Sequence, residues 1–120
     1  MLKFNRVLLI GFVLSLAVSK LIWMADIANP GARYPINDIF DGKDNPNMQG
    51  QLNSVGMRQQ YLLGTYLRAD YIDGLQLVNG KYFPGAIEVF ACSNVDRTYD
   101  SALSRLYGLF PIGSGWQIPE

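Results

Sequence analysis

Apolar and polar residues follow one another in blocks that predict strand, loop, helix, strand and helix, in that order. Residues 21–28 read LIWMADIA, a short run of large apolar side chains broken only by Asp26. This pattern is typical of a strand buried on both faces. Since an unpaired buried carboxylate is costly, we expect Asp26 to meet a loop N–H or an arginine. Residues 31–50, rich in Gly, Pro, Asn and Asp, predict an irregular loop.

The first predicted helix begins at Asn53 or Ser54 and ends at Asp70 or Tyr71. Either polar side chain at its start can accept a hydrogen bond from an N–H of the first turn. Helical spacing predicts an apolar stripe and a wetter side. The residues that fall at this spacing are Val55, Gln59, Leu62, Leu63 and Tyr66, and Arg58 and Arg68 can lie on the side that faces solvent.

A connector and a second strand are predicted next. The turn dipeptides Asp73-Gly74 and Asn79-Gly80 suit a small hairpin. Residues 86–93, AIEVFACS, predict the strand.

The second predicted helix is capped by Ser93 or Asn94, has Asp96 in its first turn and stops at Gly108. The residues from 109 onward predict a loop. The apolar stripe of this helix is expected to contain Val95, Tyr99, Ala102, Leu103 and Leu106.

This order of elements is the opening of an α/β fold with a right-handed crossover. Ligands bind beyond the carboxyl ends of strands in such folds, which predicts that residues 29–35 and 93–98 share one pocket. Tyr61, Tyr66, Tyr99 and Tyr107 are expected to be packing residues rather than substrate contacts.

The N-terminal segment has the pattern of a cleaved secretory signal peptide over residues 1–19. Lys3 and Arg6 precede an apolar run over residues 7–18, which closes on small residues. The alternatives are a membrane anchor over residues 7–24, with Lys20 within it, and an organellar presequence. The predicted localisation is therefore the secretory pathway, with a secreted or lysosomal product or, alternatively, a membrane-anchored one.

Composition excludes several function classes. Ten basic and ten acidic residues give zero net charge, which argues against a nucleic-acid partner. Cys92 is the single cysteine and there is no histidine, so the residues predict no zinc site and no imidazole chemistry. We expect Cys92 to be a small buried apolar residue. No cofactor is implied.

Three blocks of residues carry the candidate chemistry, in order along the chain. The first is Gly31-Ala32-Arg33-Tyr34-Pro35. The second covers residues 50–60 and continues through Leu63-Gly64 and Leu67-Arg68. The third covers residues 92–98, with Ser101-Ala102 and residues 107–111 after it.

These blocks resemble the N-terminal portion of the histidine acid phosphatases, a branch of the histidine phosphatase superfamily. The resemblance implies a three-layer α/β/α fold and phosphomonoester hydrolysis through a phosphohistidine. An imidazole attacks phosphorus, arginines neutralise the phosphoryl oxygens and an acid protonates the leaving alkoxide. Arg33 and Arg97 would be the phosphate ligands, since guanidinium forks match phosphate oxygens and stay charged. Without the motif, both arginines would be assigned to surface pairs with Asp38, Asp96 or Asp100.

The sequence departs from the family at the nucleophile. Asn29 stands where the signature has its first arginine, and Pro30 stands where it has the nucleophilic histidine. Proline offers no nucleophile and no backbone N–H. The family's later His-Asp pair has no counterpart in these residues. The resemblance therefore implies a pseudoenzyme: no catalytic residue is assigned, and a phosphate or phosphomonoester remains the expected ligand.

Residues 20–120 are thus expected to form a truncated, inactive phosphatase-like domain. Two strands and two helices cannot cover both faces of a sheet, so we expect this incomplete sheet to need a missing C-terminal portion or another protein. One alternative is a non-catalytic structural or partner-binding subunit, whose membrane contact is confined to an uncleaved N-terminal helix. Another is the front of an active enzyme, with an error at codon 30 and a premature end.

Overall fold

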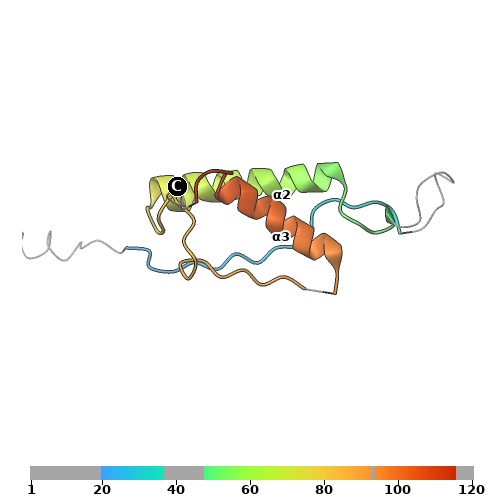
Figure 1. The fold of residues 1–120 in the computed structure, drawn as a ribbon, viewed down its shortest axis with the longest axis horizontal. Helices are drawn as coiled ribbons and strands as arrows, with labels where there is room; N and C mark the ends of the chain where they lie inside the picture. The colour runs from blue at the N-terminus through green and yellow to red at the C-terminus, as the bar shows by residue number, and fades with distance from the viewer. Residues whose placement is uncertain (1–19, 37–47, 93, 116–120) are drawn as a thin grey trace, which may run out of the picture.

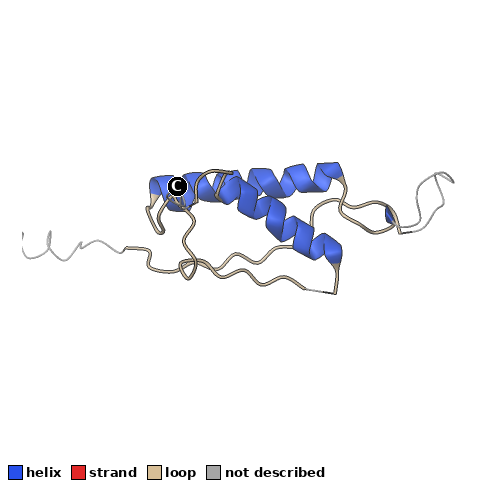
Figure 2. Cartoon of the chain, in the orientation of Figure 1, coloured by secondary structure: helices blue, strands red, loops and turns tan. Residues whose placement is uncertain are grey.

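Two α-helices dominate the computed structural model, which describes residues 20–36, 48–92 and 94–115. Helix α2 spans Ser54–Leu67, and helix α3 spans Asp96–Leu109. A π-helical segment, η2, spans Arg68–Gly74 and continues α2 (Figures 1 and 2). Both predicted helices are therefore confirmed.

Helix α2 begins where the sequence predicts. Asn53 is its N-cap, and the Asn53 Oδ1 accepts a hydrogen bond from the Gly56 N–H at 2.8 Å. This bond satisfies one of the N–H groups that the first turn leaves without a helical partner.

The far end of α2 differs from the prediction. The α-helical hydrogen bonding stops at Leu67, but η2 carries the helical path on to Gly74, where the Leu75 N–H bonds to the Asp70 C=O at 2.8 Å. The hairpin expected around Asp73-Gly74 is therefore wrong. An i→i+5 bond closes a wider helical turn at the place where a β-turn was expected.

The start of α3 is shifted from the predicted cap. Val95 occupies the N-cap position and makes no side-chain cap hydrogen bond, and the helix begins at Asp96. A cap on Asn94 is therefore wrong by one position, and Ser93 lies outside the described residues. The expected acidic residue in the first turn, Asp96, is confirmed.

The two helices cross at a point where each has a glycine, Gly64 in α2 and Gly108 in α3. A Cβ on Gly64 would overlap the Arg105 carbonyl oxygen of α3 and lie 2.9 Å from the Leu109 nitrogen. A Cβ on Gly108 would overlap the Tyr61 carbonyl oxygen of α2 and lie 2.8 Å from the Thr65 nitrogen. The backbones approach so closely because neither helix carries a side chain at the crossing. Gly108 is therefore a packing residue inside α3, and its prediction as the helix stop is wrong.

The buried side of α2 is not the predicted apolar stripe. Its buried residues are Gly56, Gln60 and Gly64, whereas Val55 and Tyr66 are 58% and 65% exposed. The side of α2 with small residues is buried because only that side lets neighbouring backbone come close. The larger apolar side chains of α2 therefore face outward. The tyrosines expected to pack are exposed as well, so that prediction is wrong. The exposed members of the predicted sets are Val55, Gln59, Tyr61, Leu62, Leu63, Tyr66, Tyr99, Leu103 and Tyr107.

Neither predicted strand forms a ladder within the described ranges. Residues 20–36 and 86–92 run beside the helix pair without sheet pairing (Figures 1 and 2). The β-pairings there are isolated bridges, one antiparallel between Arg33 and Leu52 and one parallel between Pro84 and Ile87. The strand assignments and the layered sheet are thus not seen in this part of the chain. A lone parallel pair is only marginally stable, because parallel sheets depend on cover over both faces.

The small core lies around the ends of the helices. Among the described residues, the buried apolar ones are Leu52, Ile72 and Phe110. Tyr82 packs edge-on against Phe110, with ring centroids 5.5 Å apart. Within residues 20–36, 48–92 and 94–115, no helix is both long and apolar enough to cross a bilayer. The predicted leader over residues 1–19 lies outside these ranges.

Candidate phosphate site

The helices hold the backbone of residues 29–32 with their side chains. The Gln60 Nε2 donates a hydrogen bond to the Asn29 carbonyl oxygen at 3.0 Å. The Gly31 N–H donates to the Ser101 Oγ at 3.1 Å, and the Ala32 N–H donates to the Gln59 Oε1 at 3.0 Å. Three backbone polar groups of this segment thus have partners without a sheet, and Pro30 itself has no N–H to satisfy.

Residues 32–34 also pair with residues 51–53, just ahead of α2. The Tyr34 N–H donates to the Gln51 carbonyl oxygen at 2.9 Å, and the Asn53 N–H donates to the Ala32 carbonyl oxygen at 3.1 Å. Arg33 lies opposite Leu52 in the bridge between them. The backbone on both sides of Arg33 is therefore fixed, while its side chain is exposed.

Arg97 approaches the same region from the first turn of α3. It is half-buried, and its Nη1 would lie 3.9 Å from a Cβ on Gly50. Its carbonyl oxygen accepts a hydrogen bond from the Ser101 Oγ at 2.6 Å. We call residues 29–35 and residues 94–98 the two arginine-bearing segments. Residues 50–52 lie next to both, because Gly50 is near Arg97 and Leu52 is opposite Arg33.

We expected residues 29–35 and 93–98 to share one pocket at the carboxyl ends of two strands. In the described residues, a helix side chain rather than a pair of strand ends links Gly31 to Arg97. The Ser101 hydroxyl joins the two arginine-bearing segments directly, because it contacts Gly31 in one segment and Arg97 in the other. No strand edge frames the meeting point within the described ranges.

Neither arginine forms an ion pair with a described acidic residue. The ion pairs in these ranges join Arg68 to Asp73, at 3.8 Å, and Arg105 to Asp26. The surface pairs of Arg33 or Arg97 with Asp96 or Asp100 are thus not formed, and Asp38 lies outside the described residues. Two guanidinium groups without described carboxylate partners can interact with an anion.

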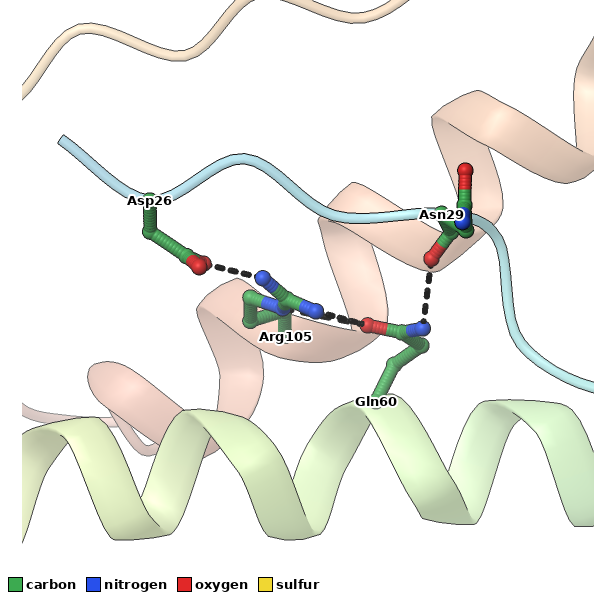
Figure 3. A network of polar contacts seen from close by, with 4 residues as sticks. All are labelled: Asp26, Asn29, Gln60 and Arg105. Carbon is green, nitrogen blue, oxygen red and sulfur yellow. Dashed lines mark hydrogen bonds and ion pairs between the residues drawn. The ribbon is translucent and has the colours of Figure 1, made fainter.

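A polar network braces the segment just before Pro30 (Figure 3). The Arg105 Nε and Nη2 donate to the Gln60 Oε1 at 3.0 and 2.6 Å, and the Arg105 Nη1 pairs with Asp26. Gln60 then holds Asn29 through its amide nitrogen. The expectation that Asp26 meets an arginine is confirmed.

Sequence reasoning missed three members of this arrangement. Gln60 is only 4% exposed and Ser101 only 5% exposed, and both are hydrogen bonded to the 29–31 segment. Arg105 reaches across from α3. Gln60 and Ser101 are polar residues on the buried faces of α2 and α3. Because their partners in residues 29–31 are distant in the sequence, their role could not be predicted from helical spacing.

The position next to this network carries no imidazole. Pro30 is half-buried and Asn29 is exposed. Cys92 is a free, exposed cysteine, so its prediction as a buried residue is wrong. Among the described residues, no group of three or more His, Cys, Asp or Glu side chains is placed to hold a metal ion.

The sequence that carries this arginine-bearing loop, the following helix and the second arginine matches a phosphatase family. The family model of the histidine phosphatase superfamily, branch 2, matches residues 31–117. The chain therefore belongs to this superfamily, which confirms the resemblance and implies an α/β fold for the whole domain.

The particular relatives are acid phosphatases. Prostatic acid phosphatase of Bos taurus is 32% identical over 118 residues, covering 92% of this chain and 30% of the relative. Prostatic acid phosphatase of Rattus norvegicus is 32% identical over 115 residues, covering 87% and 29%. Lysophosphatidic acid phosphatase type 6 of Bos taurus is 39% identical over 62 residues, covering 51% and 14%. The chain thus spans less than a third of the length of these relatives.

Proposed function

We propose that this chain binds a phosphate or phosphomonoester group through Arg33 and Arg97 and does not by itself hydrolyse it. The observation that carries the proposal is the meeting of the two arginine-bearing segments at the Ser101 hydroxyl, with no carboxylate among the described residues paired to either guanidinium. Family membership supports phosphate as the anion.

The absence of turnover follows from the residues at the nucleophile position. Asn29 and Pro30 stand in place of the signature's arginine and histidine, and the 120 residues contain no histidine. A phosphohistidine therefore cannot form on these residues alone. Loss of a covalent nucleophile costs about a millionfold in turnover in a well-studied hydrolase.

Titration of the purified chain with inorganic phosphate tests the binding proposal. Charge-assisted hydrogen bonds contribute about 1.5–3 kcal/mol, so Arg33→Ala and Arg97→Ala should each weaken binding by roughly 10- to 100-fold. Arg58→Ala is the matched control, because Arg58 is an exposed arginine on α2 and has no ion pair with a described residue. Equal affinity of all four proteins would refute the assignment.

A p-nitrophenyl phosphate assay at acidic pH tests the absence of turnover. The chain should release nitrophenol no faster than buffer. Turnover above this background that disappears with Arg97→Ala would show that the site is catalytic after all.

A second candidate function, a partner-binding subunit, is favoured by the outward apolar side of α2. Val55, Leu62 and Tyr66 are 58%, 52% and 65% exposed. We propose that further acid-phosphatase-like protein covers this side, since the relatives are more than three times as long as the part that this chain matches. Replacement of these three residues by Ser, Gln and Lys should abolish association with a purified acid-phosphatase C-terminal fragment, while phosphate binding by Arg33 and Arg97 persists.

The route into the secretory pathway belongs to the same proposal. A leader over residues 1–19 predicts a mature N-terminus at Lys20, whereas a retained anchor predicts Met1. Intact-mass measurement of the product from a secretory host distinguishes the two, and it also decides whether membrane contact is available to the subunit.

A further inference from the structure

Ser101 joins the two halves of the phosphate site through one hydroxyl group. Its Oγ donates to the Arg97 carbonyl oxygen at 2.6 Å and accepts from the Gly31 N–H at 3.1 Å. Ser101 is 5% exposed, so water competes poorly for either bond. The hydroxyl is therefore used both as donor and as acceptor, and its partner Gly31 lies 70 positions before Ser101 in the sequence.

We propose that Ser101 is a positioning residue that sets the relative placement of Arg33 and Arg97 for phosphate. This role rests on the proposed phosphate-binding function. Gly31 lies two residues before Arg33, and the backbone between them is also held at Ala32 by Gln59. Loss of the Ser101 hydroxyl would free the Gly31 N–H and remove the direct link between the first arginine segment and α3.

Neighbouring interactions define what Ser101 alone contributes. Gln59 and Gln60 hold Ala32 and Asn29 to α2, and Arg105 of α3 pairs with Asp26 further upstream. Among the described residues, the Ser101 hydroxyl alone makes a hydrogen bond that ties Gly31 itself to α3, the helix that carries Arg97. The Ser101→Ala variant should therefore keep the segment near α2 and lose its register against Arg97. Phosphate binding, which needs both guanidinium groups at once, should be more sensitive to this loss than folding is.

Ser104 provides a matched control on the same helix. Its Oγ donates to the Asp100 carbonyl oxygen at 2.7 Å, the same i−4 bond that Ser101 makes to Arg97, but it accepts no hydrogen bond from residues 29–32. Ser104→Ala removes the helix bond alone. The difference between the two alanine variants isolates the bond to Gly31.

The experiment measures phosphate affinity by calorimetry and hydrogen exchange of the Gly31 amide by NMR on the wild type, Ser101→Ala and Ser104→Ala. Ser101→Ala should weaken phosphate binding by about three- to tenfold, the effect of one net hydrogen bond, and deprotect the Gly31 amide. Ser104→Ala should change neither. Circular dichroism should show equal helix content in all three proteins.

Each outcome decides the proposal. Equal phosphate affinity of the two variants, with the wild type binding, would overturn the role of Ser101 and leave the phosphate site standing. A loss of helix content in Ser101→Ala alone would show a purely structural role and also overturn it. No phosphate binding by the folded wild type would overturn the proposed function together with this role.

Discussion

Adding one methyl group at the helix crossing should separate α2 from α3. In Gly64→Ala the new Cβ would overlap the Arg105 carbonyl oxygen and lie 2.9 Å from the Leu109 nitrogen, and both are backbone atoms of α3. Carbon atoms pack favourably at about 3.5–4.0 Å, so relieving the overlap with the Arg105 oxygen would move the helices apart by roughly 1.5–2 Å. Backbone cannot rotate away from the methyl group as a flexible side chain can.

Two effects of opposite sign decide the size of the change. Alanine is about 1 kcal/mol better than glycine inside a helix, which stabilises the variant. Overpacking costs about 1–3 kcal/mol, and more where the contacting atoms cannot yield. Because the obstructing atoms are backbone, we expect the clash to win and the net destabilisation to be about 1–2 kcal/mol. In a domain of this size that lowers the Tm by roughly 5–15 °C.

Thermal and urea unfolding followed by circular dichroism measures this change. Gly115→Ala is the control, because nothing lies within 4 Å of a Cβ at that position. Gly108→Ala should have a similar cost to Gly64→Ala, and the double variant should cost less than the sum, since the first methyl already separates the helices. A Gly64→Ala protein as stable as the wild type would show that the helices do not cross at this point.

The remaining predictions concern polar contacts around the same helices. Asn53→Ala should lower the free energy of unfolding by about 1 kcal/mol, because α2 loses its cap. Urea unfolding measures this, and the control Ser54→Ala should be as stable as the wild type. Equal destabilisation by the two variants would contradict the cap. Gln60→Leu should cost about 1–3 kcal/mol, since the Asn29 carbonyl and Arg105 lose a buried partner. Unaltered exchange of the amides near residue 29 would argue against that bracing. The Arg68 Nη1 donates a hydrogen bond to the Leu109 carbonyl oxygen at 2.9 Å, so Arg68→Met should fray the C-terminal end of α3. Hydrogen exchange should then be faster for the amides of the last turn of α3.

The sequence was informative about the elements that local chemistry specifies. Asn53 marks the start of α2 because its side chain can accept a hydrogen bond from within the first turn, and this signal needs no tertiary information. Asp26 was identified as a residue in need of a partner, because the cost of an unpaired carboxylate in an apolar run is general. The ordered blocks identified the superfamily, because the residues within each block are neighbours in the sequence.

Periodicity alone could not identify which face of each helix is buried. Val55, Leu62 and Tyr66 form a good apolar stripe, yet the crossing with α3 selected the face that carries Gly64 and Gln60. A stripe shows which side chains favour burial, but the partner helix determines which side is covered. The predicted strands are not seen in the described residues for a related reason. A strand needs a paired neighbour, and residues 29–32 form hydrogen bonds with helix side chains instead.

By itself, the sequence determined the helices, the family and the absence of histidine, because each depends on residue identity or on neighbours within a few positions. Only the tertiary structure decided that Ser101 links Gly31 to Arg97, that Arg105 and Gln60 brace Asn29, and that glycine marks the helix crossing. Apart from the helical bond of Ser101 to Arg97, these contacts join residues tens of positions apart. Their geometry follows from how closely two backbones can approach, which no local pattern of apolar and polar residues specifies.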